Sequence, residues 1–196
     1  MAKSCFLILL LLVISLEISA QWHPDQIEII RDQWGVPHIY AATDAQVSYG
    51  LAWAHAEDDF GTIQTTLLAA KGMLGLHLGK DGAIADYVVG LLRTKEIVAG
   101  HLDEVAPDFL NIVKGYLAGL NAYAQHHPQE VFVKKSFPIT VEDVFQAYVL
   151  QLAVMDGADG VIGGLIKGDI DHGALIGIGS NAFVFNRKKT GSDHVM

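Results

Sequence analysis

Apolar positions alternate in part with polar ones over residues 26–30 and recur at helical spacing further along the chain. Residues 26–30 and 36–41 are rich in β-branched and aromatic side chains and flank a turn that contains Gly35. This arrangement predicts a β-hairpin. Pro37 marks the start or the edge of the second strand, because proline cannot donate a ladder hydrogen bond.

A long amphipathic helix is expected directly after the hairpin. Thr43 and Gln46 have the spacing of a capping box, in which each side chain bonds the backbone amide of the other. Apolar residues then recur every three or four positions before Gly72: Tyr49, Ala52, Trp53, Ala56, Phe60, Ile63 and Leu67. The same spacing predicts a second helix between Pro107 and Pro128 and a third that begins near Val141.

The last part of the chain has a different character. Eight of the 23 residues from Gly157 to Gly179 are glycine, and each glycine inside a helix costs ~1 kcal/mol relative to alanine. We therefore expect a flexible loop here, followed by a strand over 180–186. Another strand begins near Asp193 where the chain stops, so we expect the chain to be truncated.

Residues 1–20 have the features of a secretory signal peptide. Lys3 precedes a run of 11 residues, Phe6 to Leu16, in which only Ser15 is polar, and Ser19 and Ala20 are small enough for cleavage. Such a run is too short to cross ~30 Å of hydrocarbon comfortably, although an uncleaved anchor is the alternative. We therefore expect a periplasmic or secreted protein with no membrane span after signal cleavage.

Charge and composition exclude several classes of protein. The 196 residues contain 13 Lys and Arg against 22 Asp and Glu, which gives a net charge of −9. This acidity argues against a nucleic-acid binder, which needs a basic face. Hydrophobic residues at 51% and charged residues at 18% are typical of a folded chain. Cys5 lies in the leader, so the exported part has no disulfide, no Cys-ligated metal and no thiol nucleophile.

The densest polar cluster runs from His55 to Asp59. Its spacing is neither that of a His-Glu-x-x-His zinc site nor that of a zinc deaminase, which requires a pair of cysteines. We therefore interpret the cluster as the polar face of the first long helix. His126-His127 and Lys134-Lys135 are interpreted as solvated positions at a helix end and in a loop.

Calcium is the one metal that the acidic residues suggest. Asp156 with Asp159, and Asp169 with Asp171, could supply oxygen ligands, but neither pair fits the EF-hand loop. A structural Ca²⁺ therefore stays open, and no metal ligand is assigned.

Three segments together resemble the penicillin acylase family of N-terminal nucleophile (Ntn) hydrolases. They are Ile30–Ile39, Tyr49-Gly50 followed by Ala54–Asp58, and Gly179–Phe183. Their order and spacing resemble a whole α chain and the first strand of a β chain. The resemblance implies an α+β fold, the four-layer αββα Ntn-hydrolase sandwich. This chain would be a fragment of it, a mostly helical α-chain region with an N-terminal β-hairpin.

The resemblance also implies how the chain is divided and where its chemistry lies. Residues 1–20 would be the signal peptide and 21–179 the α-chain region, which ends in a Gly-rich spacer over about 157–179. Residues 180–196 would be the truncated start of a β chain. Autoproteolysis would cut between Gly179 and Ser180. Ser180 would then be the nucleophile, with its own α-amino group as the base, and no cofactor would be required.

The family further implies a small-molecule amide as substrate, cleaved to a carboxylic acid and an amine. An N-acyl-homoserine lactone and a β-lactam are the two candidates. The helix after Val141 resembles the one that lines the acyl pocket in relatives, which places Leu152, Met155 and Asp156 as substrate-binding residues. Penicillin G acylases often carry Arg-Phe near these positions, so their absence here favours an aliphatic acyl group.

The remaining part of the site is implied to lie outside this chain. The oxyanion donors of the family come further along the β chain, beyond Met196, so we expect the chain to be inactive alone. Its partner would be the β chain of the same precursor. The alternative is a non-catalytic secreted ligand-binding module, in which the Gly179–Ser180 bond stays intact.

Overall fold

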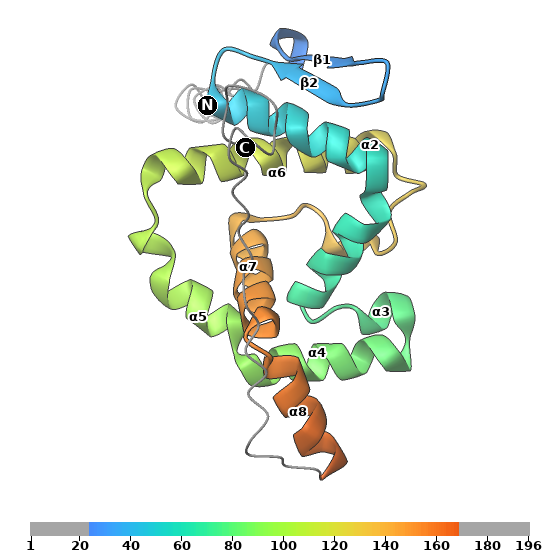
Figure 1. Cartoon of the computed structure of the whole chain (residues 1–196), viewed down its shortest axis with the longest axis vertical. Coiled ribbons are helices and arrows are strands. Elements are labelled where there is room, and N and C mark those ends of the chain that lie inside the picture. The colour runs from blue at the N-terminus through green and yellow to red at the C-terminus, as the bar shows by residue number, and fades with distance from the viewer. Residues whose placement is uncertain (1–23, 169–196) are drawn as a thin grey trace, which may run out of the picture. The chain divides into compact units, whose positions relative to one another are not determined.

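The computed structural model of the protein describes residues 24–168. They divide into two compact units, the first ending at Leu150 and the second beginning at Gln151. The described strands and 3₁₀ helices are β1 (Glu28–Arg31), β2 (Pro37–Tyr40), η1 (Pro24–Gln26), η2 (Leu102–Glu104) and η3 (Lys134–Ser136). The described α-helices are α2 (Asp44–Ala70), α3 (Gly75–Leu78), α4 (Lys80–Leu92), α5 (Thr94–His101), α6 (Pro107–His126), α7 (Val141–Met155) and α8 (Ala158–Lys167) (Figure 1).

The hairpin predicted from the sequence is confirmed. β1 and β2 pair antiparallel, with Ile29 opposite Ile39 and Arg31 opposite Pro37, so Pro37 does open the second strand. Successive side chains of a strand point to opposite faces, and the face with Ile29 and Ile39 is the one that contacts α2. The hairpin lies across α2 in Figure 1.

Asp32 holds the turn of the hairpin. Its Oδ1 accepts hydrogen bonds from the backbone N–H groups of Trp34 at 2.8 Å and Val36 at 3.0 Å. The first of these bonds is the main reason why the pKa of Asp32 lies below its ordinary value. Gly35 takes a φ of 82°, in the left-handed region that glycine adopts without steric cost.

The first long helix begins where the sequence predicts. The Thr43 hydroxyl accepts from the Gln46 backbone N–H at 3.3 Å and so caps α2. The prediction that the Gln46 side chain bonds the Thr43 backbone amide in return is wrong. The Gln46 amide group donates to the Gln26 side chain at 3.4 Å and its oxygen accepts from the Thr43 hydroxyl, which ties the helix to the segment before β1.

The glycines of α6 allow α2 and α6 to pack closely. A Cβ at Gly115 would overlap the Ala45 carbonyl oxygen, and one at Gly119 would overlap the Tyr49 carbonyl oxygen. Small residues one turn apart let two helix backbones approach in this way. Between the two helices lies the core of the first unit, formed by Ala52, Ala56, Phe60, Leu67, Val113, Leu117, Leu120, Tyr123, Ala124 and Ile139.

A third glycine seats the hairpin on the opposite side of α2. A Cβ at Gly50 would lie 2.7 Å from Cγ2 of Ile39 and 3.0 Å from Cγ2 of Ile27. Both distances are too short for carbon atoms in contact. The absence of a side chain at Gly50 therefore lets the isoleucines of the hairpin rest on the helix backbone.

Residues 75–101 form helices α3 to α5, which the sequence analysis did not assign. The Asp86 carboxylate accepts from the backbone N–H groups of Leu74 at 2.7 Å and Gly75 at 2.9 Å, and this joins α4 to the start of α3. Arg93 separates α4 from α5 with a φ of 53°, which is unfavourable for a residue with a side chain.

The expectation for the Gly-rich segment is wrong over its first part. Residues 158–167 form α8, set off from α7 by Gly157, which has a φ of 81°. Its apolar residues Val161, Ile162, Leu165 and Ile166 recur at helical spacing. The rest of the expected spacer, and the expected strand over 180–186, lie outside the described residues.

The close approach of α2 and α6 gives a direct test of the packing. Replacing Gly119 with alanine places a methyl group against the Tyr49 carbonyl, so we expect Gly119→Ala to lower the free energy of unfolding by about 2–3 kcal/mol. Gly90→Ala is the matched control, because the structure leaves open space there. It should raise the stability by ~0.5–1 kcal/mol through helix propensity. Urea unfolding followed by circular dichroism measures both, and equal effects would contradict the packing described.

Candidate functional site

Arg31, at the end of β1, joins two of the sequence segments that carry the family resemblance. Its Nη2 lies 3.1 Å from Oε2 of Glu57 and 2.8 Å from Oδ1 of Asp58, both on α2. Its Nη1 donates to the Gly35 carbonyl at 2.9 Å. One guanidinium therefore connects the turn of the hairpin to the middle of the helix, and its bonds to Glu57 and then Asp58 raise the pKa of Arg31 above its ordinary value.

The two carboxylates are held by further contacts on α2. Oε1 of Glu57 accepts from the indole N–H of Trp53 at 2.9 Å, one turn earlier. The next acid, Asp59, has extended backbone angles inside the helix and accepts from the Thr62 N–H at 3.0 Å. Asp59 thus caps a restarted helix, and bonding to Thr62 lowers its pKa. The polar cluster from His55 to Asp59 was interpreted as the polar face of the helix. In the structure it also attaches the hairpin to α2, through Glu57 and Asp58, and contains the break in the helix at Asp59.

A group of rings lies on the neighbouring faces of α2 and α6. His55 Nδ1 is 3.3 Å from the hydroxyl of Tyr116, whose pKa is raised by burial. His127 stacks on Tyr123 with ring centroids 4.0 Å apart and contacts the Tyr123 carbonyl through Nδ1 at 3.1 Å. His127 is therefore half-buried and ends α6, whereas the sequence analysis interpreted it as solvated.

None of the residues described so far presents a free nucleophile or a metal site. Glu57 and Asp58 are paired with Arg31, and His55 is occupied by Tyr116. Over residues 24–168 no three His, Cys, Asp or Glu side chains gather so as to hold a metal ion.

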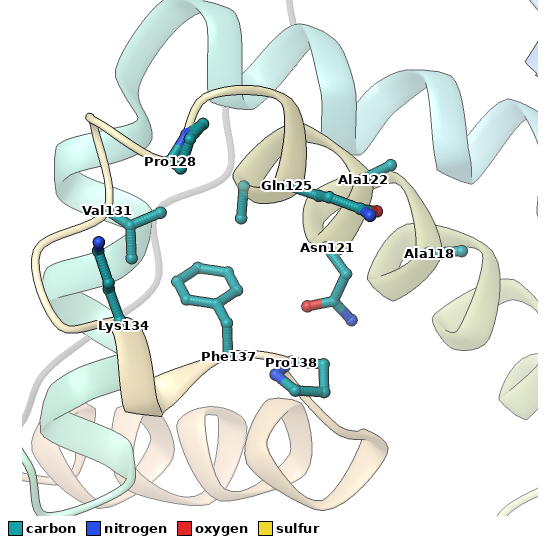
Figure 2. A pocket seen from close by; sticks show the side chains of 10 residues that line it. Ala118, Asn121, Ala122, Gln125, Pro128, Val131, Lys134, Phe137 and Pro138 are labelled. Carbon is teal, nitrogen blue, oxygen red and sulfur yellow. The ribbon is translucent and has the colours of Figure 1, made fainter.

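The segment that follows α6 forms one wall of a pocket of about 530 Å³. α6 forms the other wall with its small side chains Ala118 and Ala122. Figure 2 shows the Phe137 ring between the two walls, with Pro128 and Val131 on the loop side. Asn121, Gln125 and Lys134 are the polar residues of the lining. Lys134, which was interpreted as a solvated loop residue, is exposed but lines this pocket.

Three polar side chains fix the loop wall, and sequence reasoning missed all of them. Gln64, 2% exposed, donates to the Glu130 carbonyl at 3.0 Å and accepts from the Phe132 N–H at 2.8 Å. Asn121 pairs with both backbone groups of Ile139, at 2.7 and 2.9 Å.

Lys71 is the third of these side chains. It donates to the Ser136 carbonyl at 3.1 Å and pairs with Asp143 at the start of α7. No sequence signal marks Gln64, Asn121 or Lys71 as loop anchors, because they bond mainly to backbone atoms of residues far along the chain.

Only some of the residues predicted to carry the reaction lie in the part of the chain that the structure describes. Gly179 and Ser180 lie outside the described residues. Leu152, Met155 and Asp156 lie at the end of α7 and just beyond it, in the second unit, and share one side of the helix at spacings of three and four. Leu152 is 61% exposed and Met155 51%, so their side chains are accessible in the described part of the chain.

The fold of the chain is that of a penicillin acylase. The thermostable penicillin G acylase from Alcaligenes faecalis superposes with a TM-score of 0.55 at 20% sequence identity, over 80% of this chain and 98% of the solved chain. The described residues contain the helices and a two-stranded antiparallel sheet. The sequence model of the penicillin amidase family matches residues 26–196. The chain belongs to the penicillin amidase family.

Curated relatives agree with this assignment to a family of acylases. Penicillin G acylase of Escherichia coli is 27% identical over 123 residues, which are 63% of this chain and 14% of the relative. Penicillin acylase 2 proenzyme of Pseudomonas sp. (strain SE83) is 29% identical over 97 residues, 50% of this chain and 12% of the relative.

An acyl-homoserine lactone acylase is also among the relatives. PvdQ of Pseudomonas fluorescens (strain Pf0-1) is 22% identical over 194 residues, 91% of this chain and 25% of the relative. The chain thus spans between an eighth and a quarter of the length of these three relatives. No helix among residues 24–168 has the length and apolar character needed to cross a bilayer.

The Arg31 contacts predict a salt-sensitive attachment of the hairpin. Arg31→Met removes every bond to Glu57 and Asp58, and Arg31→Lys keeps the charge but loses the planar fork of donors. We expect the melting temperature to fall in the order wild type, Arg31→Lys, Arg31→Met, by a few degrees at most because the pairs are partly exposed. The differences should shrink in high salt. Differential scanning fluorimetry at two salt concentrations measures this, and differences in melting temperature that stay the same size in high salt would contradict it.

Proposed function

We propose that this chain is the amino-terminal part of an exported amidohydrolase that acts through Ser180. The observation that carries the proposal is the extent of the family match, which runs from residue 26 through Gly179-Ser180 to residue 196. The contact between Arg31 and the Glu57-Asp58 pair supports it, because it joins the two earlier segments of the resemblance in one place.

The precursor first cleaves itself between Gly179 and Ser180. The Ser180 hydroxyl adds to the Gly179 carbonyl carbon, and the peptide nitrogen leaves as the new α-amine, so that an ester replaces the amide. Water then hydrolyses this ester and returns the hydroxyl group. The result is a Gly179 carboxylate and a free Ser180 amino terminus, which leaves the α-chain region and the β chain as separate polypeptides.

The new terminus then performs the reaction on a substrate. An α-amino group has a pKa of ~7.7–8, so an appreciable neutral fraction is present near neutral pH to take the proton from Oγ, directly or through a water molecule. Oγ attacks the amide carbon of the substrate and a tetrahedral oxyanion forms. The amine leaves with the proton, and water hydrolyses the acyl-enzyme to a carboxylic acid. No step uses a cofactor.

Leu152, Met155 and Asp156 are proposed to contact the acyl group. They share one side of the chain at the end of α7, and Leu152 and Met155 present aliphatic surface without an aromatic ring. An aliphatic acyl chain fits such a surface better than a phenylacetyl group. An N-acyl-homoserine lactone is therefore favoured over a β-lactam with an aromatic side chain.

Residues 1–20 are proposed to direct export to the periplasm or the medium and then to be removed. The partner of the α-chain region is the β chain of the same precursor. The relatives include both a proenzyme and acylases named for two substrate classes, so processing and substrate choice require separate tests.

Processing is tested on the complete reading frame that encodes this chain. Mass spectrometry of the purified protein should find one polypeptide that begins at Ser180 and another that ends at Gly179. Ser180→Ala should remain uncut and lose amide hydrolysis by ~10³-fold or more, because nucleophile and base are both affected. Ser192→Ala, a serine in the same segment, is the matched control and should process normally. An intact protein whose activity survives Ser180→Ala would instead identify a different site, and an intact inactive protein that binds ligand would identify a binding module.

Substrate choice is tested with a panel of phenylacetyl amides and N-acyl-homoserine lactones of increasing chain length. We expect kcat/KM to be highest for an aliphatic acyl chain. Leu152→Phe should lower kcat/KM for long chains relative to short ones by ~10-fold or more, because the added volume would leave less room for a long acyl chain at the proposed site. Gln151→Phe adds a ring on another side of the same helix and should leave the ratio unchanged. An equal effect of both variants would remove Leu152 from the acyl site.

A further inference from the structure

We propose that the pocket between α6 and the 128–138 loop binds a small amphiphilic carboxylate, with its apolar tail inside and its charged end on Lys134. The pocket holds about 530 Å³, within the ~300–1,000 Å³ range of small-molecule sites. This inference concerns binding to the first unit alone and does not rest on the proposed reaction.

The shape of the pocket arises from small residues facing a large ring. Ala118 and Ala122 lie one turn apart on α6 and leave that side of the helix without bulk. Phe137 stands opposite them (Figure 2), and its ring also packs against the core, with its centroid 5.9 Å from that of Phe60. The space between the two walls is therefore lined mainly by carbon atoms and suits an alkyl chain.

Hydrogen bonds within the protein hold both walls of the pocket in place, so the pocket does not need a ligand in order to form. Asn121 donates one N–H to the Ile139 carbonyl and accepts from the Ile139 N–H through its own carbonyl, and these two bonds hold it as part of the wall. Gln64 and Lys71 fix the loop at Glu130, Phe132 and Ser136 from the α2 side. A site formed in advance in this way binds without a large ordering cost.

The polar residues of the pocket determine the charge of the ligand. In the part of the chain that the structure describes, the Lys134 ammonium and the Gln125 amide have no hydrogen-bond or ion-pair partner. The nearby Glu130 carboxylate accepts from the Tyr123 hydroxyl at 3.1 Å instead. The free Lys134 cation at the edge of an apolar pocket complements a ligand with one anionic end.

The experiment uses the full chain and octanoate as the probe. Isothermal titration calorimetry should give a Kd of ~1 mM or tighter, as expected for a ligand with so few atoms. Lys134→Gln should weaken octanoate by ~3- to 5-fold, because the ion pair is exposed to solvent, and should leave 1-octanol, the neutral analogue, unchanged. Lys135→Gln is the matched control, since Lys135 is the adjacent lysine and does not line the pocket.

A second variant tests the apolar part of the site. Ala122→Leu adds bulk to the α6 wall and should reduce the binding of both octanoate and octanol by ~10-fold or more. If this variant does not fold, as judged by circular dichroism, the comparison of Lys134→Gln with Lys135→Gln decides alone. The proposal is overturned if wild-type chain binds no octanoate at millimolar concentration. It is also overturned if both lysine variants weaken octanoate equally, or if a folded Ala122→Leu variant binds it unchanged.

Discussion

The first unit depends on how closely α2 and α6 approach each other. Gly115 and Gly119 place bare backbone against the carbonyls of Ala45 and Tyr49, and the core residues of both helices meet only because this distance is short. The opposite side of α2 repeats the arrangement at Gly50, where the isoleucines of the hairpin rest. α2 is therefore approached closely on two sides, by the glycines of α6 at Ala45 and Tyr49 and by the hairpin at Gly50.

The Arg31 contacts orient the hairpin on this tightly packed helix. Hydrophobic packing of the isoleucines at Gly50 brings the hairpin onto the helix. The fork of donors on Arg31 reaches Glu57 and Asp58 from the strand end and the Gly35 carbonyl in the turn. Such paired contacts fix orientation more than they add stability, because all three side chains are partly exposed. The same residues carry the family resemblance, and their role in the described structure is to position the hairpin.

The elements that the sequence predicted correctly are those with a strong local signal. The hairpin has β-branched strands around a Gly turn, and α2, α6 and α7 have a continuous apolar stripe with a start signal. Helices α3 to α5 are short and are joined by bonds such as those of Asp86 to the start of α3, which no local pattern reveals. α8 was missed because the glycine content was given more weight than the apolar spacing between the glycines.

The candidate sites were predictable to different degrees. The resemblance pointed to Ser180 and to the end of α7 from short motifs, and the assignment of Ser180 remains a prediction. The pocket beside α6 gave no signal, because its walls come from residues 118–138 and its supports from residues 64 and 71. Only the folded chain brings these together, and most of the bonds concerned end on backbone atoms.

Those backbone bonds have a consequence for how this region can change over evolutionary time. Gln64 and Asn121 hold the loop through the main chain of residues 130, 132 and 139, so these bonds themselves do not depend on which side chains the loop carries. Residues that line the cavity from the loop can be exchanged for others while the path of the chain stays the same. The scaffold thus separates the shape of the cavity from its chemistry, and related proteins could adapt it to different small molecules without refashioning the fold.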